Sequence, residues 1–425
     1  MINEENVSLH STEELKERVI LVGVDKGSGD MEEEACLEEL AQLVDTAGAE
    51  VVGQLIQKRD SFNGAHYVGK GKIEEIKYMI DAFDATGIIC DDELSPNQLK
   101  NLEKLLDTKV MDRTMLILDI FAGRAVSREG KIQVELAQLK YRLSRLAGIG
   151  TSLSRLGGGI GTRGPGEKKL ETDRRYIKER ISELKKDLKD AQAHRELLRN
   201  RRKKNFACLS LIGYTNAGKS TILNTLTDAG VLAEDKLFAT LDPTTRLVKL
   251  PAGTEILLTD TVGFIQKLPH QLIEAFKATL EELVFADYLI HVVDASNPHR
   301  DEQMEVVYKT IRDLKCEHIP VITVFNKCDL EVALPLPRDK NAEAQVTACG
   351  KNKAGLEDLL VKAEEIIKAS KKVRKILIPY TEGNLVAMIH KKCEMISEEH
   401  TGGGTLIEAY LDEEMENRLS KYFTE

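Results

Sequence analysis

The octapeptide GYTNAGKS at residues 213–220 carries the residue types that polyphosphate chemistry needs. It follows an apolar run at residues 206–212 and precedes a helix-like stretch, which is the context that the phosphate-binding loop G-x-x-x-x-G-K-[ST] requires. Its glycines let backbone amides turn toward a phosphate, its lysine supplies a cation and its serine a hydroxyl for Mg²⁺. The residues expected to line the ligand are Gly213, Tyr214, Thr215, Asn216, Ala217, Gly218, Lys219 and Ser220.

Two further motifs follow in order, each after an apolar, strand-like run. DTVG places a carboxylate where it can hold Mg²⁺ through water, and a glycine amide where it can sense a γ-phosphate. In NKCD, the aspartate can accept hydrogen bonds from guanine N1–H and its exocyclic amine, which adenine cannot offer, so the site should select GTP. The residues are Asp260, Thr261, Val262 and Gly263, then Asn326, Lys327, Cys328 and Asp329.

The composition is that of a folded protein with room for about three domains: 425 residues, 42% hydrophobic and 31% charged. The N-terminus is acidic and polar, and no apolar run approaches the roughly 18 residues that a membrane span needs. Seven cysteines are scattered without C-x-x-C spacing, which favours reduced thiols. We therefore expect a cytoplasmic protein without a membrane span, and a monomer.

The net charge of −10 hides a basic middle. Residues 124–204 contain 23 lysines and arginines against 10 aspartates and glutamates. Positive charge concentrated in one part of an acidic chain indicates a local contact with a polyanion such as RNA. A solvated helical face is the alternative interpretation.

The pattern of elements predicts an α/β protein in four parts. Residues 1–123 alternate strands (18–25, 51–56, 87–90, 110–111) with helices (31–43, 73–83, 95–106), which predicts a small parallel α/β domain. A basic helical hairpin follows at 124–204, then a P-loop domain at 205–370 with strands near 206–212, 246–250, 255–258, 288–293, 321–325 and 345–347. A small C-terminal α/β domain (371–425) has strands at 376–378 and 406–411 and helices at 385–396 and 413–423.

The hairpin is predicted from two apolar stripes, the first running from Ile132 to Leu146 with spacings of 4-3-4-3. Between them lies the glycine-rich loop 147–166, which contains Arg155 and Arg163 and no acidic residue. We expect these arginines to contact RNA, with an idle flexible linker as the alternative. YVGKGK at 67–72 could likewise meet a phosphate, or be a plain turn before a helix.

Three segments give the chain a family resemblance. FATLDPTTR (238–246), GGGIGTRGPGE (157–167) and LETDRR (170–175), together with the motifs above, resemble HflX-type GTPases of the Obg–HflX group. The resemblance implies a P-loop GTPase domain that binds and hydrolyses GTP with Mg²⁺. It also implies association with the large ribosomal subunit and its rRNA, in ribosome rescue, splitting or the stress response.

The same resemblance assigns further residues to the nucleotide site. Thr240 is the expected second Mg²⁺ ligand beside Ser220, with Thr244 and Thr245 as rivals. The backbone amide of Ala348 is expected near guanine O6. These segments add Phe238, Ala239, Thr240, Leu241 and Asp242, then Thr347, Ala348 and Cys349.

The position after D-x-x-G, where many small GTPases carry a water-orienting glutamine, is Phe264 here. We therefore expect slow hydrolysis by the free protein and acceleration on the ribosome. Gln266 and Arg246 are weak candidates for a catalytic contribution. The alternatives are a GTP-dependent switch that binds a protein partner away from the ribosome, and an RNA-remodelling NTPase.

Overall fold

The structure, a computed structural model, describes residues 16–27, 32–154, 165–203, 206–227, 236–267, 282–332, 335–370, 372–411 and 413–424. The chain divides into two compact units. The first comprises residues 1–188 with the short segments 236–238 and 266–276, and the second comprises 189–235, 239–265 and 277–425. Two of the boundaries between the units therefore fall within FATLDPTTR, directly after Phe238, and shortly after DTVG, between residues 265 and 266.

The first unit contains a four-stranded parallel sheet in the order β2-β1-β3-β4. Its strands are β1 (Arg18–Asp25), β2 (Glu50–Lys58), β3 (Gly87–Cys90) and β4 (Lys109–Asp112). Parallel neighbours need crossover connections, which α1 (Glu33–Thr46), α2 (Lys70–Phe83) and α3 (Pro96–Leu106) supply. The predicted parallel α/β arrangement is confirmed, with helix ends shifted by up to three residues.

Helices α2 and α3 share a core with one face of this sheet, whereas α1 contacts β1, β2 and α4. Ser95 begins α3 through a capping box with Gln98, as expected of a serine followed by Pro96. The sequence analysis missed α4 (Arg113–Arg124), whose run TMLILDIF is apolar on nearly every side and so lacks a 3.6-residue pattern. Asp112 caps α4 by accepting a 2.9 Å hydrogen bond from the Met115 amide.

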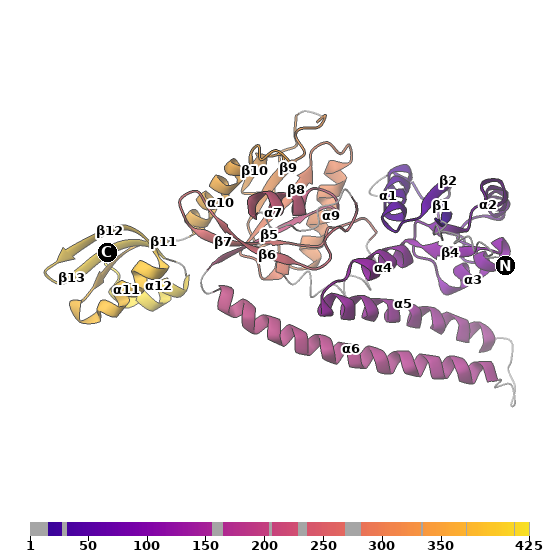
Figure 1. Cartoon of the computed structure of the whole chain (residues 1–425), viewed down its shortest axis with the longest axis horizontal. Coiled ribbons are helices and arrows are strands. Elements are labelled where there is room, and N and C mark those ends of the chain that lie inside the picture. Colours follow the sequence, from indigo (N-terminus) through magenta and orange to yellow (C-terminus); the bar gives the residue numbers. More distant parts are fainter. Residues whose placement is uncertain are drawn as a thin grey trace, which may run out of the picture. The chain divides into compact units, whose positions relative to one another are not determined.

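Two long helices, α5 (Arg128–Ser154) and α6 (Pro165–Lys203), form the predicted hairpin and lie side by side in Figure 1. Ile132 and Leu136 of α5 pack against Ile177, Ile181 and Leu184 of α6, as the apolar stripes predicted. The prediction of a loop from residue 147 was wrong, because α5 continues to Ser154. The glycines at 148 and 150, each of which costs a helix roughly 1 kcal/mol, therefore do not end this helix.

A six-stranded sheet in the order β10-β9-β8-β5-β7-β6 forms the larger part of the second unit. All neighbours are parallel except β6, which is antiparallel to β7. The strands are β5 (Ala207–Gly213), β6 (Thr244–Lys249), β7 (Glu255–Asp260), β8 (Tyr288–Asp294), β9 (Val321–Asn326) and β10 (Ala344–Thr347). All six coincide with expected strands to within two residues at each end.

Apolar cores cover both faces of this sheet. One contains Ile222 and Leu223 of α7 (Lys219–Thr227) and Leu359 of α10 (Leu356–Ser370). The other contains Val307 and Ile311 of α9 (Arg300–Asp313). Because the strands between the two cores are parallel, their carboxyl ends meet at one edge, where such sheets bind ligands.

The last part of the second unit is an antiparallel sheet in the order β11-β13-β12. It consists of β11 (Lys372–Ile378), β12 (Glu394–Thr401) and β13 (Gly404–Leu411), with α11 (Gly383–Lys392) and α12 (Glu413–Leu419). The predicted helix over 385–396 was wrong at its end, because residues from Glu394 onward pair with β13 through a tight turn. The last helix ends at Leu419, and a short 3₁₀ turn, η2 (Ser420–Tyr422), follows it.

Within the described part of the chain, none of the helices combines the length and the apolar character that crossing a membrane demands.

Candidate nucleotide-binding site

The loop GYTNAGKS connects β5 to α7 at the carboxyl edge of the six-stranded sheet. Gly213 and Gly218 have φ of 149° and 97°, in a region that side chains disfavour. A Cβ atom at Gly213 would lie 2.2 Å from the Val292 carbonyl oxygen, and one at Gly218 would lie 2.2 Å from Asn326 Nδ2. Both positions therefore require glycine for the loop to form.

Lys219 is buried at the start of α7, and among the described residues its hydrogen-bond partners are two backbone carbonyl groups. Its Nζ donates to the carbonyl oxygens of Gly213 (3.1 Å) and Tyr214 (2.7 Å). Burial lowers the pKa of Lys219 to about 8, and the nearby Asp260 carboxylate opposes that shift. A buried ammonium that burial destabilises in this way favours an anionic ligand, as a phosphate would be.

Three oxygen-bearing side chains converge beside this lysine. Ser220 Oγ lies 2.7 Å from Thr240 Oγ1 and donates to Asp260 Oδ2 at 2.6 Å. Asp260 is fully buried, which raises its pKa, and its Oδ1 has no hydrogen-bond partner among the described residues. Thr215 Oγ1 is likewise buried without a partner there. Hard oxygen ligands with an unsatisfied carboxylate fit Mg²⁺, which Ser220, Thr240 and Asp260 could hold directly or through water.

The structure separates Thr240 from its two rivals. Thr244 and Thr245 belong to β6, and the Thr245 hydroxyl is hydrogen-bonded to Thr259 Oγ1 at 2.9 Å. Of the three threonines, Thr240 is the one that contacts Ser220. Its role as a metal ligand stays a prediction.

The DTVG segment lies directly on the P-loop. The Thr215 amide donates to the Phe264 carbonyl at 2.7 Å, and the Phe264 amide donates to the Gly213 carbonyl at 3.1 Å. A Cβ atom at Gly263 would lie 2.8 Å from Thr215 Cα and 3.0 Å from Lys219 Nζ. DTVG, which the family resemblance makes the second switch, thus lies on the side of the loop where a γ-phosphate bound by Lys219 would sit.

Asn326 connects the loops expected to hold the base. Its Nδ2 donates to the Ala217 carbonyl at 2.8 Å, and its Oδ1 accepts from the Gly350 amide at 2.9 Å. Asp329 Oδ1 accepts from Cys349 Sγ at 3.1 Å, and that hydrogen bond is the main reason that the pKa of Asp329 is lowered. The structure therefore brings NKCD, the P-loop and the segment 347–350 together, as the proposed guanine site requires.

Two groups that were predicted to contact the base, the Ala348 amide and Lys327, interact with other residues of the chain in this structure. The Ala348 amide donates to the Phe325 carbonyl at 2.8 Å, within the register of β9 and β10, so its contact with guanine O6 stays a prediction. Lys327 has a φ of 61° and forms a 2.7 Å ion pair with Asp294. That pair holds the lysine stem beside the end of β8.

FATLDPTTR, which the family resemblance makes the first switch, begins in the first unit. Phe238 is 2% exposed, and its ring packs edge-on against Phe121 of α4 with centroids 4.6 Å apart. The next residues, Ala239, Leu241 and Asp242, belong to the second unit and are buried or half-buried. The structure thus places the Phe238 side chain in an apolar core.

The two weak catalytic candidates do not converge on the P-loop in this structure. The Gln266 side chain is buried in the first unit, where its Oε1 accepts from Cys36 Sγ at 3.5 Å. Arg246 is exposed on β6 and donates to the Thr245 carbonyl at 3.0 Å. Arg155 and Arg163, the predicted RNA contacts, lie outside the described residues.

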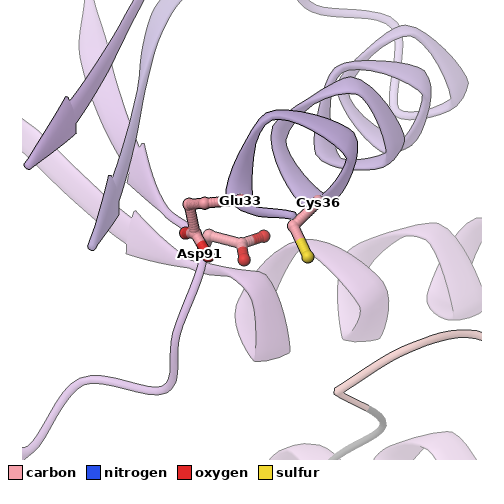
Figure 2. A group of neighbouring side chains, drawn as sticks. All are labelled: Glu33, Cys36 and Asp91. Carbon is pink, nitrogen blue, oxygen red and sulfur yellow. The ribbon is translucent and has the colours of Figure 1, made fainter. Parts of the chain in front are cut away.

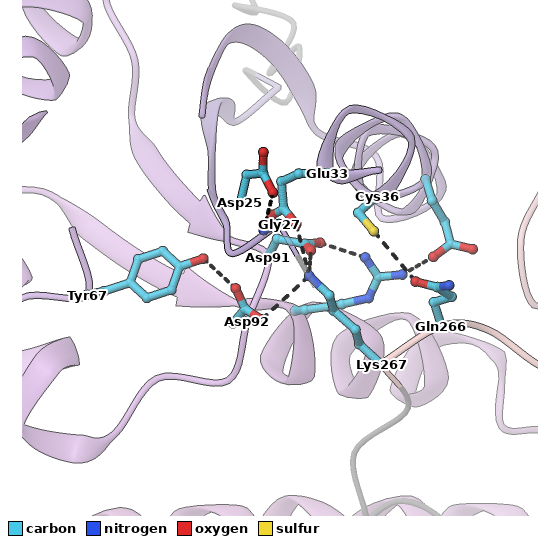
Figure 3. Close-up of polar contacts among 11 residues, drawn as sticks. Asp25, Gly27, Glu33, Cys36, Tyr67, Asp91, Asp92, Gln266 and Lys267 are labelled. Atoms are coloured by element: carbon cyan, nitrogen blue, oxygen red, sulfur yellow. Dashed lines mark hydrogen bonds and ion pairs between the residues drawn. The ribbon is translucent and has the colours of Figure 1, made fainter. Parts of the chain in front are cut away.

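A buried group of carboxylates in the first unit was not found from the sequence. Glu33, Cys36 and Asp91 present ligand atoms within 4.8 Å of one another (Figure 2). However, the ammonium of Lys267 ion-pairs with Asp91 and lies 3.5 Å from Glu33 Oε2, so a side chain already supplies the cation (Figure 3). The sequence feature that could have indicated this group is the pair Asp91 and Asp92 directly after the apolar strand β3, at the carboxyl edge of a parallel sheet.

Comparison with known families agrees with this site. Residues 34–122 match the family described as "GTP-binding GTPase N-terminal", and residues 124–202 match "GTP-binding GTPase Middle Region". Residues 208–327, which include the P-loop, DTVG and NKCD, match "50S ribosome-binding GTPase". The six-stranded sheet and these motifs define a P-loop GTPase.

Similar proteins narrow the class. The chain is 57% identical to the GTPase HflX of Lacrimispora saccharolytica over 95% of each chain. It is 50% identical to the GTPase HflX of Caldanaerobacter subterraneus, over 96% of this chain and 94% of that one. A GTP-binding protein of Sulfolobus solfataricus, solved with GDP, is similar at 24% identity and a TM-score of 0.43, over 82% of this chain and 98% of that one. The chain belongs to the HflX family of GTPases.

Proposed function

We propose that this GTPase is a factor of the large ribosomal subunit that acts in ribosome rescue, splitting or the stress response. The observation that carries the proposal is the match of residues 208–327 to a family described as 50S ribosome-binding, in a chain whose residues 124–204 are strongly basic. Nucleotide state would set the two switches, and the basic hairpin would contact rRNA. The four parts proposed are residues 1–123, 124–204, 205–370 and 371–425.

The proposed nucleotide site uses the geometry above. P-loop amides and Lys219 hold the phosphates, while Ser220 and Thr240 bind Mg²⁺, and Asp260 supports it through water. The ion neutralises phosphate charge when bound. Asp329 selects guanine, and Asn326 fixes the surrounding loops. Chelation of Mg²⁺ should abolish turnover, and Thr240→Ala should weaken Mg²⁺-dependent GTP binding more than GDP binding.

We further propose slow hydrolysis by the free protein. The residue after D-x-x-G is Phe264, which is 2% exposed and cannot orient a water molecule by a side-chain hydrogen bond. The ribosome would then order the switches or supply the missing group. Phosphate release measured with and without purified large subunits tests this, and equal turnover would contradict it.

Ribosome association is tested by sedimentation with large subunits in a GTP analogue, in GDP and without nucleotide. The double variant Arg155→Glu, Arg163→Glu should bind more weakly, and its remaining affinity should fall less steeply as salt rises because fewer cations contact phosphate, while GTP binding stays unchanged. A matched control, Lys309→Glu with Lys315→Glu, makes the same charge change on exposed residues in and just beyond α9. Unchanged co-sedimentation of the arginine variant would show that these two arginines of the loop 147–166 are not needed for binding to the large subunit.

The alternative of a protein partner away from the ribosome predicts a different result. The purified chain would then fail to sediment with large subunits in any nucleotide state, yet would retain a defined protein in a GTP-dependent pull-down. The basic character of residues 124–204 favours the RNA contact.

A further inference from the structure

The thiol of Cys349 donates a hydrogen bond to the carboxylate that is expected to read guanine. Cys349 Sγ lies 3.1 Å from Asp329 Oδ1, although the two residues are 20 positions apart in the chain. Cys349 is 3% exposed, whereas Asp329 is exposed to solvent. The thiol therefore contacts the carboxylate from the protein side, and the solvent side of the carboxylate stays accessible to a ligand.

The turn that carries Cys349 is fixed by backbone hydrogen bonds. The Cys349 amide donates to the Ala354 carbonyl at 2.9 Å, and the amide of the next residue donates to Asn326 Oδ1 at 2.9 Å. Gly355 has a φ of 71°, a conformation that glycine adopts readily, at the point where the turn meets α10. Cys349 therefore presents its thiol from a well-defined position.

The carboxylate of Asp329 depends on this thiol for its orientation. The terminal torsion of an aspartate side chain is broad, so an exposed carboxylate rotates easily unless a partner holds it. Among the described residues, Cys349 is the side chain that donates a hydrogen bond to Asp329. Lys327 and Lys351 also favour the negative charge of Asp329, and Lys327 is itself paired with Asp294. The hydrogen bond from Cys349 is therefore the directional contact on this carboxylate.

Guanine makes a particular demand on that orientation. Its N1–H and exocyclic amine lie side by side, so each oxygen of the carboxylate must face one of them. An ionised carboxylate has about four acceptor sites on its two oxygens, so Oδ1 can accept from Cys349 and from guanine together. Hypoxanthine, the base of inosine diphosphate (IDP), has the N1–H but no exocyclic amine. A carboxylate free to rotate should therefore lose more affinity for GDP than for IDP.

We propose that Cys349 is a positioning residue that sets the preference for guanine over hypoxanthine. By donating to Asp329 Oδ1, the thiol holds the carboxylate with both oxygens toward the edge of the base. This inference rests on the proposed nucleotide site, in which Asp329 selects guanine. If that assignment fails, the unaltered protein will bind GDP, IDP and ADP with similar affinity. If only the role of Cys349 fails, the unaltered protein will prefer GDP and Cys349→Ala will keep the same preference.

The test is titration of GDP and IDP into the full chain. A thiol is a weak donor, so Cys349→Ala should lower GDP affinity by about threefold to tenfold, and IDP affinity by less than about twofold. Cys349→Ser keeps a donor and should hold the ratio of the two affinities within about twofold of the unaltered protein. The control Cys316→Ala removes another buried thiol of the second unit, which donates to the Leu314 carbonyl at 3.5 Å, and should leave the ratio unchanged.

The ratio separates positioning from a general loss of structure. A distorted site would weaken GDP and IDP in equal proportion, whereas a misdirected carboxylate weakens GDP more. Cys349→Val fills a volume similar to that of cysteine without a donor, and should show the same narrowed ratio if Cys349→Ala folds poorly. An unchanged ratio in Cys349→Ala or Cys349→Val would overturn the proposal. A ratio in Cys349→Ser that falls as far as in Cys349→Ala would overturn it as well.

Discussion

Replacement of Asn326 by alanine tests whether one buried amide holds the nucleotide site together. Asn326 is 2% exposed and forms hydrogen bonds to backbone groups of two different loops. Its donor satisfies the Ala217 carbonyl in the P-loop, and its acceptor satisfies the Gly350 amide beside the predicted guanine contacts. Asn326→Ala removes both bonds without adding bulk.

The magnitude follows from the two backbone groups that lose their partner. An unsatisfied buried donor or acceptor costs about 1–3 kcal/mol, so the pair should cost about 2–6 kcal/mol. The lower limit corresponds to roughly a thirtyfold change in an equilibrium constant. Because both loops serve GTP and GDP alike, the loss should appear for both nucleotides.

The assay is titration of fluorescent GTP and GDP, with urea unfolding followed by circular dichroism. We expect affinity for each nucleotide to fall thirtyfold or more, or unfolding to shift by an equivalent free energy. The control is Asn352→Ala, because the exposed Asn352 accepts only from the nearby Ala354 amide at 3.0 Å. Asn326→Ala with affinities within threefold of the unaltered protein and unchanged unfolding would refute the reasoning.

Two further predictions concern the first unit. Asp112 is fully buried, accepts hydrogen bonds from the Leu94 amide (3.0 Å) and the Tyr141 hydroxyl (2.8 Å), and is paired with Arg145. Asp112→Ala should therefore lower the free energy of unfolding of the first unit by about 3–5 kcal/mol, because it leaves the largely buried Arg145 without this carboxylate. A thermal-unfolding loss below about 1 kcal/mol would contradict this. Burial raises the pKa of Glu33 from 4.5 to about 7, so the folded state holds an extra proton between these values and loses stability as pH rises through them. Glu33→Gln should remove this pH dependence of the free energy of unfolding, measured between about pH 4.5 and 8. The same pH dependence in the variant and the unaltered protein would contradict the prediction.

Much of the fold was predictable because its signals are local. Each expected strand of the four-stranded and six-stranded sheets appears, and Ser95-Pro96 begins α3 as its capping chemistry requires. The hairpin seam followed from apolar spacing alone. α4 was missed because its apolar run has no distinct face. β12 was missed because residues after Lys392 become a strand only by pairing with β13.

The candidate site shows the same division. Residue types and order were enough to predict the P-loop, DTVG and NKCD, since a phosphate cradle and a guanine-reading carboxylate each need particular chemistry at fixed spacing. Sequence left three threonines as possible metal ligands, and the fold brings Thr240 to Ser220. It also gave no indication that Gln266 would be buried against Cys36.

The sequence by itself therefore determined that the protein binds a guanine nucleotide. The glycines, lysine and carboxylates that this needs lie at fixed spacings within short segments of the chain, so their pattern can be recognised without the fold. Only the tertiary structure decided that Lys267 meets Asp91, because 176 residues separate them and no local pattern links the two. Long-range burial of opposite charges depends on how the sheet and helices of the first unit assemble. That assembly brings Lys267, four residues after Gly263, into contact with Glu33, Asp91 and Asp92.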